Sequence, residues 1–118
     1  MTETSNDRIL DSGDRVLIIT RRLFSDDVQR HFVGLVDRVA ANAVLVHGYA
    51  FVHDVGQGKL VRRKNQRSRV FCLDNYITIF VLPDDVEIQD VRYEQHEDGQ
   101  LVVTDGKEFR IDLSEFST

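Results

Sequence analysis

The sequence predicts an all-β protein, with a small five-stranded β-barrel over residues 13–83 and an acidic C-terminal β-meander over residues 84–118 that packs on or beside the barrel. Short runs of apolar and β-branched residues alternate with turn residues, and such runs are typical of strands and too short for helices. Two of the longer runs carry a central glycine, which lets a strand bend inside a tightly coiled sheet. Near the C-terminus, Asp-Gly pairs separate short alternating segments, a pattern that predicts hairpins.

Length and composition indicate one globular domain, since the chain has 118 residues of which 42% are hydrophobic and 30% charged. The longest apolar runs fall far short of the roughly 20 residues that cross a bilayer. The N-terminal stretch lacks the basic start and the apolar segment of a secretory signal. Cys72 is the single cysteine, which excludes an intrachain disulfide and a cysteine-rich zinc site. We therefore expect a cytoplasmic protein without a membrane segment.

Five strands are expected in the barrel, after a flexible N-terminus over residues 1–12. They span residues 15–20, 28–39, 44–54, 70–73 and 76–82. The second strand is apolar on both faces, which predicts burial on both sides. Gly34 and Gly48 lie within the second and third strands, and we assign them a structural role as bends. Pro83 ends the fifth strand because proline has no N–H to donate to a ladder.

Charge is distributed unevenly along the chain. Residues 15–69 hold eleven Lys and Arg against four Asp, a net charge of +7, whereas residues 84–118 carry a net charge of −8. The densest stretch is residues 62–69, where five of eight residues are basic. This basic run is either a loop between the third and fourth strands or an exposed hairpin that extends them. Its charge either is solvated and paired with the acidic segment or binds a polyanion.

The acidic segment is predicted to fold as a meander rather than to form a disordered tail. Residues 91–95, 100–104 and 108–113 alternate in hydrophobicity, and an Asp-Gly pair lies in each gap between them. The expected buried side consists of Leu101, Val103, Phe109, Ile111 and Leu113.

Two stretches carry a resemblance to a known family. FVGLV at residues 32–36, a short turn and VLV at residues 44–46 form a glycine-bearing strand followed by another strand. CLDNYI at residues 72–77 forms a strand, a tight turn and the start of the next strand. These stretches resemble the first and second motifs of Sm-like barrels, and the resemblance covers about residues 14–83. It implies an RNA-binding small barrel that assembles into rings, with Asn75 among the RNA contacts.

The chain departs from the second motif at Leu73 and Asp74, which stand where the family has Arg and Gly. The stretches RRLF, HFVG, GYAFVHD and LVVTDG also resemble a recurrent bacterial family without an assigned function. A generic SH3-like barrel has the same small five-stranded architecture and accounts for the glycine bends as well. The fold is therefore expected to be Sm-like or SH3-like, and fold alone does not define function.

No catalytic, metal or cofactor signature is found in the sequence, and we expect a non-enzymatic protein without a cofactor. His47 and His53 lie on one predicted strand, but at about 3.3 Å per residue they are roughly 20 Å apart, too far to share one ion. Cys72 lies in an apolar strand and is expected to be a core residue. No glycine-rich phosphate loop and no nucleophile with a neighbouring base is present.

The basic run remains the best indication of function, and it favours a non-enzymatic, homo-oligomeric module that binds RNA. Arginine and lysine side chains neutralise phosphates, and tyrosines offer a stacking face. The predicted nucleic-acid-binding residues are Arg62, Arg63, Lys64, Arg67, Arg69, Tyr49, Tyr76 and Asn75. The alternative is a protein-interaction or assembly module that recognises a polypeptide by strand addition and binds no nucleic acid.

Overall fold

The computed structural model describes residues 9–20, 30–54, 56, 59–74, 76–96, 98 and 100–113. Their regular structure is antiparallel β-sheet and one short 3₁₀ helix, so the all-β prediction is confirmed. Residues 1–8, 21–29 and 114–118, which include most of the predicted flexible N-terminus, lie outside the described residues. No helix in the described part is long and apolar enough to cross a membrane.

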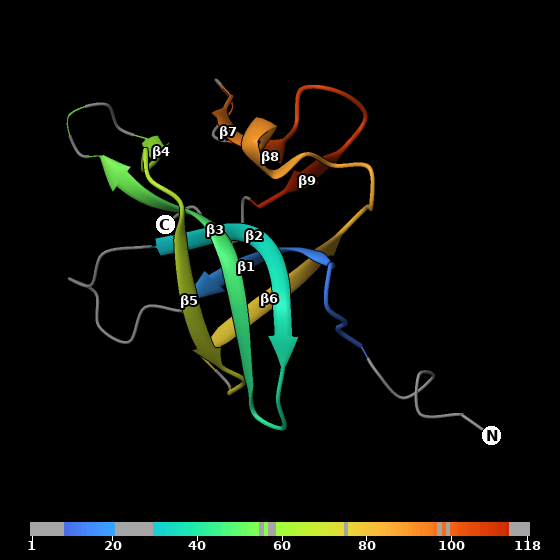
Figure 1. Cartoon of the computed structure of the whole chain (residues 1–118). Helices are drawn as coiled ribbons and strands as arrows, with labels where there is room; N and C mark the ends of the chain where they lie inside the picture. The colour runs from blue at the N-terminus through green and yellow to red at the C-terminus, as the bar shows by residue number, and fades with distance from the viewer. Residues whose placement is uncertain are drawn as a thin grey trace.

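Six strands form the larger sheet (Figure 1). They are β1 (Arg15–Thr20), β2 (Arg30–Val39), β3 (Ala43–Asp54), β4 (Lys59–Arg62), β5 (Arg67–Cys72) and β6 (Ile77–Leu82). The hydrogen-bonded order is β4-β3-β2-β1-β6, and β5 also pairs with β3. β1 has the bounds that its apolar run predicts, and β2 begins within the predicted second strand.

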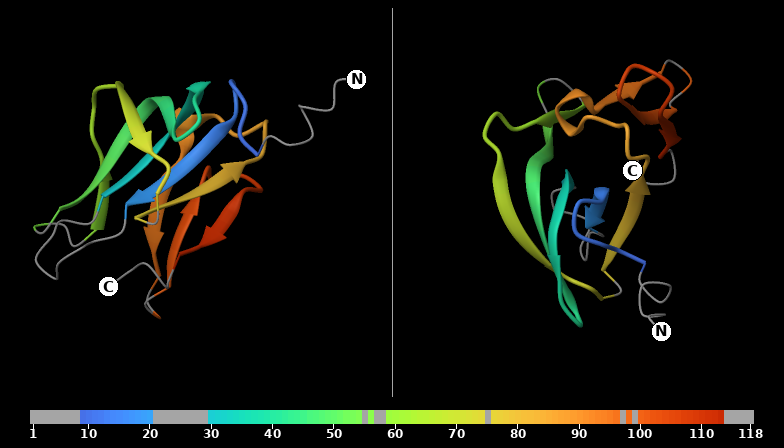
Figure 2. Two further views of the ribbon diagram at one scale, coloured as in Figure 1. Left: turned by 90° about the horizontal axis from the view of Figure 1, so that it is seen from below. Right: turned by 45° about the vertical axis from the view of Figure 1, so that its right-hand side comes forward.

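The sheet is an open half-barrel and not the closed five-stranded barrel that the sequence predicts. β5 pairs with β3 and β6 pairs with β1, but no ladder joins β5 to β6 in the described residues. The two strands lie close at the turn between them and diverge from there (Figure 2). β5 follows β3 and β6 follows β1. The curvature of the sheet is too small to bring the outer edges of β5 and β6 together.

β4 and β5 lie one after the other along the same edge of β3. β4 ends with Arg62 opposite Phe51, and β5 starts with Arg67 opposite Gly48. Residues 63–66 therefore stand opposite only residues 49 and 50, and Arg63 N donates a hydrogen bond of 2.8 Å to Ala50 O. Of the two expectations for the basic run, the structure is nearer to the hairpin, because β3 and β4 form an antiparallel hairpin and both ends of the run belong to strands that pair with β3. A bulge lies between these two ends.

Cys72 ends β5 and is exposed, which corrects the prediction that it is a core residue. It pairs with Ala43 at the end of the β3–β5 ladder. The prediction rests on the apolar neighbours of Cys72 in residues 70–73. In the structure β5 is an edge strand, so neighbouring chain does not cover it fully.

Gly34 and Gly48 face each other across the β2–β3 ladder. A Cβ atom on Gly48 would lie 2.5 Å from Gly34 Cα and closer still to the Val33 carbonyl oxygen. A Cβ atom on Gly34 would lie 2.7 Å from Val46 Cγ1 and closer still to the His47 carbonyl oxygen. The two glycines thus permit the backbones of β2 and β3 to approach closely. The sequence predicts a structural role for them as bends at these positions.

The two faces of the six-stranded sheet bury separate cores, as the two-sided apolar pattern of β2 predicts. Phe71 of β5 and Ile79 of β6 pack into the same cluster although they come from opposite edges, so the sheet curls around that cluster. We call this side the concave face; its buried residues are Val16, Ile18, Phe32, Val36, Val44 and Val46. The other side is the outer face, where Leu17, Ile19, Val33 and Phe51 are buried.

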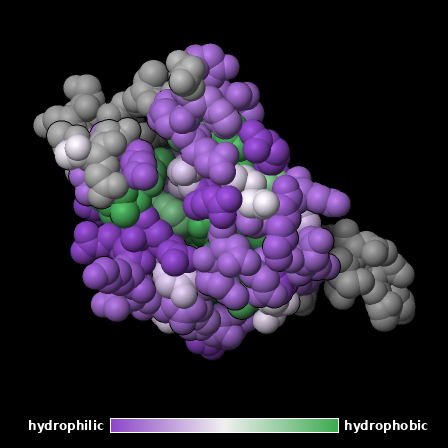
Figure 3. Space-filling model, turned by 90° about the horizontal axis from the view of Figure 1, so that it is seen from above, coloured by the Kyte–Doolittle hydropathy of each residue, from purple (hydrophilic) through white to green (hydrophobic). Residues whose placement is uncertain are grey.

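The C-terminal segment folds as a second sheet on the outer face. After a 3₁₀ helix, η2 (Ile88–Asp90), the strands β7 (Arg92–Gln95), β8 (Leu101–Thr104) and β9 (Arg110–Asp112) are ordered β7-β8-β9. The turn at residues 105 and 106 uses a glycine with φ of +82°. Of the expected buried side, Leu101, Val103 and Leu113 are buried and Phe109 and Ile111 partly so, and all five pack into the core of the outer face. Seen from above, the surface is largely hydrophilic around a hollowed hydrophobic area (Figure 3).

Candidate functional site

The bulge between β4 and β5 divides the basic run between the two faces of the sheet. Arg62 stands opposite Phe51, so its side chain projects from the outer face. Arg67 stands opposite Gly48, a position of the concave face, and Arg69 lies on the same side two residues later. Side chains that are adjacent in sequence therefore have different surroundings.

Arg62 has a structural role. Its guanidinium group lies 4.7 Å from the centroid of the Tyr49 ring and donates a hydrogen bond to the carbonyl oxygen of Gln89. The arginine thereby ties β4 to the segment that leads into the C-terminal sheet. Because Tyr49 is partly buried and covered by this cation, it does not offer the open stacking face predicted for it.

Four arginines line one cavity of about 410 Å³ at the end of the half-barrel where β2 and β5 begin. Arg63, Arg67 and Arg69 belong to the basic run, and Arg30 comes from the first position of β2. All four side chains are exposed. No carboxylate is among the described residues that line this cavity, which we call the arginine pocket.

The floor of the arginine pocket is apolar. Phe32 and Phe71 pack against each other there with ring centroids 5.4 Å apart. Ala50 and Val52 of β3 contribute small side chains, which leave the hollow open. His31 also borders the pocket, but its imidazole contacts Tyr93 on the opposite face of the sheet. The pocket therefore combines a cationic rim with a hydrophobic base.

The positive charge of the arginine pocket is not neutralised by ion pairs within the described part of the chain. Carboxylate contacts in this part of the chain include an ion pair of Glu94 with Arg92 and contacts of Asp37 with His47 and of Glu94 with His96. None of the four pocket arginines forms an ion pair with a carboxylate of the described residues. Arginines that line one cavity attract an anionic ligand, and guanidinium groups form bidentate hydrogen bonds with phosphate.

The other predicted binding residues do not join this site. Lys64 is exposed within the bulge and lines a neighbouring hollow of about 350 Å³ with Arg62 and Arg63. Tyr76 is exposed at the turn between β5 and β6, at the opposite end of β5 from Arg67. Asn75 lies outside the described residues.

Sequence reasoning misses Arg30, which stands alone far from the basic run. The sequence does hold one indication that Arg30 lies beside Phe32, because the two are two residues apart and alternate residues of a strand share a face. That Phe32 faces Phe71 across the sheet is visible only in the fold.

A second group of polar side chains lies on the outer face. His47 Nδ1 contacts the Ser68 hydroxyl, and His47 Nε2 lies 3.3 Å from Asp37 Oδ2. Their sequence separation hides this serine, histidine and aspartate set from sequence reasoning. The side chains of His47 and Asp37 are 48% and 44% exposed, so water competes for each contact. We assign the group to cross-strand polar contacts because a nucleophile site needs an enclosed, preorganised surrounding.

No family model, curated protein or solved structure matches this chain. The candidate site therefore stands on its own geometry and charge. Among the described residues, no cluster of three or more His, Cys, Asp or Glu side chains is arranged to hold a metal ion.

Proposed function

We propose that this protein is a non-enzymatic module that binds RNA through the arginine pocket and acts as a homo-oligomer. The observation that carries the proposal is the convergence of Arg30 and of Arg63, Arg67 and Arg69 on one hollow in which none of the described lining residues is a carboxylate. Concentrated like charge of this kind opposes folding, so its retention in one hollow favours a role in binding.

The strand order supports the proposal of an Sm-like or SH3-like barrel. β1 lies between β2 and β6, the last strand of the 13–83 segment, and β3 lies between β2 and the β4–β5 edge. A small barrel built from five consecutive strands has this order when its last strand pairs with its first. In this protein the edges of β5 and β6 that face each other are not paired in the described residues, and we call the opening between them the seam.

Replacing Arg67 and Arg69 with serine is expected to weaken RNA binding by at least about tenfold, since two phosphate contacts are lost. The slope of log affinity against log salt is expected to fall by about 1.4 in magnitude, about 0.7 for each lost single-strand contact. Fluorescence polarisation with a labelled single-stranded RNA of mixed sequence, at several salt concentrations, measures both quantities.

The matched control is Arg38→Ser combined with Arg110→Ser. It changes the net charge by the same amount at exposed residues that do not line the arginine pocket. An equal loss of affinity in the control and pocket variants would show a diffuse charge effect and contradict this site.

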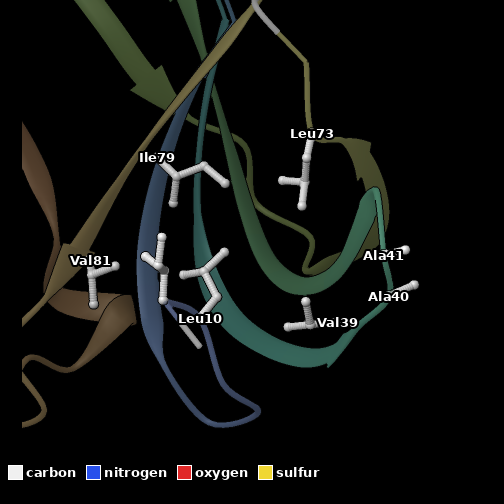
Figure 4. Close-up of a pocket in the computed structure, with 8 residues that line it drawn as sticks. Leu10, Val39, Ala40, Ala41, Leu73, Ile79 and Val81 are labelled. Atoms are coloured by element: carbon white, nitrogen blue, oxygen red, sulfur yellow. The ribbon is translucent and has the colours of Figure 1, made fainter. Parts of the chain in front are cut away.

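The homo-oligomer is proposed from the two open edges of the half-barrel. The outer edges of β5 and β6 lack a strand partner in the described residues, and Val70 and Val81 on these strands are 65% and 50% exposed. Beside this seam is a cavity of about 510 Å³, into which Leu10, Leu73 and Ile79 point (Figure 4). Pairing of β5 in one copy with β6 in the next would cover both edges and this apolar surface.

Native mass spectrometry at about ten micromolar protein is expected to show a multiple of the 13.6 kDa chain mass. Val81→Lys places a charge on the β6 edge and is expected to shift the protein to monomer. Lys107→Glu, a charge change at an exposed turn of the C-terminal sheet, is the control and should leave the mass unchanged. A monomeric parent protein at this concentration would overturn the oligomer proposal.

The same open seam favours the alternative, an interaction module that accepts a strand from another protein and binds no nucleic acid. The two functions differ in a simple observation. An absorbance ratio at 260 over 280 nm raised by copurifying nucleic acid supports RNA binding, whereas a ratio typical of protein alone favours the alternative.

A further inference from the structure

The arginine pocket is a hollow and not a track along the surface. Its walls come from the end of β1, from β2, β3 and β5, and from the bulge, and they meet at one end of the half-barrel. Its volume of about 410 Å³ lies within the range of roughly 300 to 1,000 Å³ that is usual for small-molecule sites. A site of this size surrounds one or two residues of a ligand rather than a long stretch of chain.

The charge of the pocket exceeds what one internal phosphodiester supplies. Four arginines line the hollow, and an internal phosphodiester group carries one negative charge. A phosphate monoester carries about −1.5 to −2 at neutral pH and offers three strong acceptor oxygens. A terminal phosphate or a polyphosphate therefore matches this pocket better than the middle of a strand.

The apolar floor indicates what accompanies the phosphate. Phe71 is partly buried beside the fully packed Phe32, and Ala50 and Val52 leave space above them. A sugar and a planar base can rest on such a floor, and guanidinium groups stack on planar rings as well as pair with phosphate. This combination of rim and floor suits a nucleotide better than inorganic phosphate.

We infer that the arginine pocket binds a nucleotide through its terminal phosphate, either as a free nucleoside phosphate or as the 5′ end of an RNA strand. This inference rests on the proposed function, because it names the part of the nucleic acid that the same site takes. The shared chemistry is a phosphate monoester on a nucleoside.

Two single-stranded RNA oligonucleotides of identical sequence and 3′ label, one with a 5′ phosphate and one with a 5′ hydroxyl, test the inference directly. The phosphorylated strand is expected to bind the full-length protein about tenfold more tightly, since it adds charge and charge-assisted hydrogen bonds. This preference is expected to disappear in the Arg67→Ser, Arg69→Ser variant and to persist in the Arg38→Ser, Arg110→Ser control. Unlabelled ATP is expected to displace the phosphorylated strand.

The outcomes separate the inference from the proposed function. Equal, arginine-dependent binding of both strands would overturn terminal-phosphate recognition and leave RNA binding in place. Binding of ATP without binding of either strand would overturn RNA binding and support the pocket as a site for free nucleoside phosphates. Binding of neither strand and no ATP binding by calorimetry would overturn both.

Discussion

Gly48→Ala is expected to lower the free energy of unfolding by more than about 3 kcal/mol, enough to unfold a domain of marginal stability. The added Cβ would lie 2.5 Å from Gly34 Cα and closer still to the Val33 carbonyl oxygen. Both are backbone atoms of β2, so no side-chain rotation relieves the clash. The β2–β3 ladder must separate, and this ladder holds the centre of the sheet. Urea unfolding followed by circular dichroism measures the effect.

Gly56→Ala is the matched control for this substitution. Among the described residues, a Cβ atom on Gly56 would approach the Asp54 side chain alone, with 3.3 Å to Oδ1. This variant is expected to stay within about 0.5 kcal/mol of the parent or to be slightly more stable. If Gly48→Ala were as stable as Gly56→Ala, the close approach of β2 and β3 would be wrong.

Lowering the pH from 7 to 4 is expected to cost about 3 kcal/mol of stability through His31 alone. Its side chain is 2% exposed between the two sheets, where Nδ1 contacts the Tyr93 hydroxyl and Nε2 has no partner within the described residues. Burial lowers the pKa of His31 from 6.5 to about 4. Between these values the unfolded chain binds a proton that the folded protein excludes, so stability falls as pH falls and the loss is complete below pH 4.

The comparison of parent and His31→Phe isolates this contribution, because other groups titrate equally in both proteins. The difference in their unfolding free energy is expected to change by about 3 kcal/mol between pH 7 and pH 4. Thr78→Val, at an exposed residue without a titratable group, is the control and is expected to keep the pH dependence of the parent. In a direct measurement by nuclear magnetic resonance, a His31 titration midpoint above pH 6 would contradict the buried neutral imidazole.

Tyr93 responds at the other end of the pH range. Its ring packs against both His31 and Phe51, with centroids 5.1 and 5.0 Å away. Burial raises the pKa of the Tyr93 hydroxyl well above its ordinary value of 10.0. The folded protein therefore keeps this hydroxyl neutral when the unfolded chain ionises it, which favours unfolding in strong alkali. The contact between His31 and Tyr93 therefore makes the otherwise apolar interface between the two sheets less stable at both low and high pH.

Much of the secondary structure could be predicted because it is a local property. The bounds of β1 follow from a single apolar run between turn residues, and the two-sided burial of β2 follows from its alternation. The Asp-Gly turn at residues 105 and 106 predicts the turn between β8 and β9 in the same way. The exposure of Cys72 could not be predicted in this way, because an apolar run of this kind occurs both in central strands and in edge strands.

The candidate site could be predicted only in part. The basic run supplies three of the four arginines of the pocket, but its spacing does not reveal which side chains share a face. The bulge opposite residues 49 and 50 decides that Arg62 turns to Tyr49 and that Arg67 turns to the concave face. Arg30 enters the site through the pairing of β2 with β3, which no local pattern contains.

The all-β class, the alternation of buried and exposed positions, a glycine within each of two strands and the uneven charge can all be read from the amino-acid sequence. These depend on neighbouring residues, whose spacing along a strand sets their faces. Three features emerge only from the folded arrangement: no ladder joins β5 to β6 in the described residues, the two glycines meet in register, and four arginines share one hollow. Each of these depends on the register between segments far apart in the chain, and that register is set by a bulge and by packing rather than by local pattern.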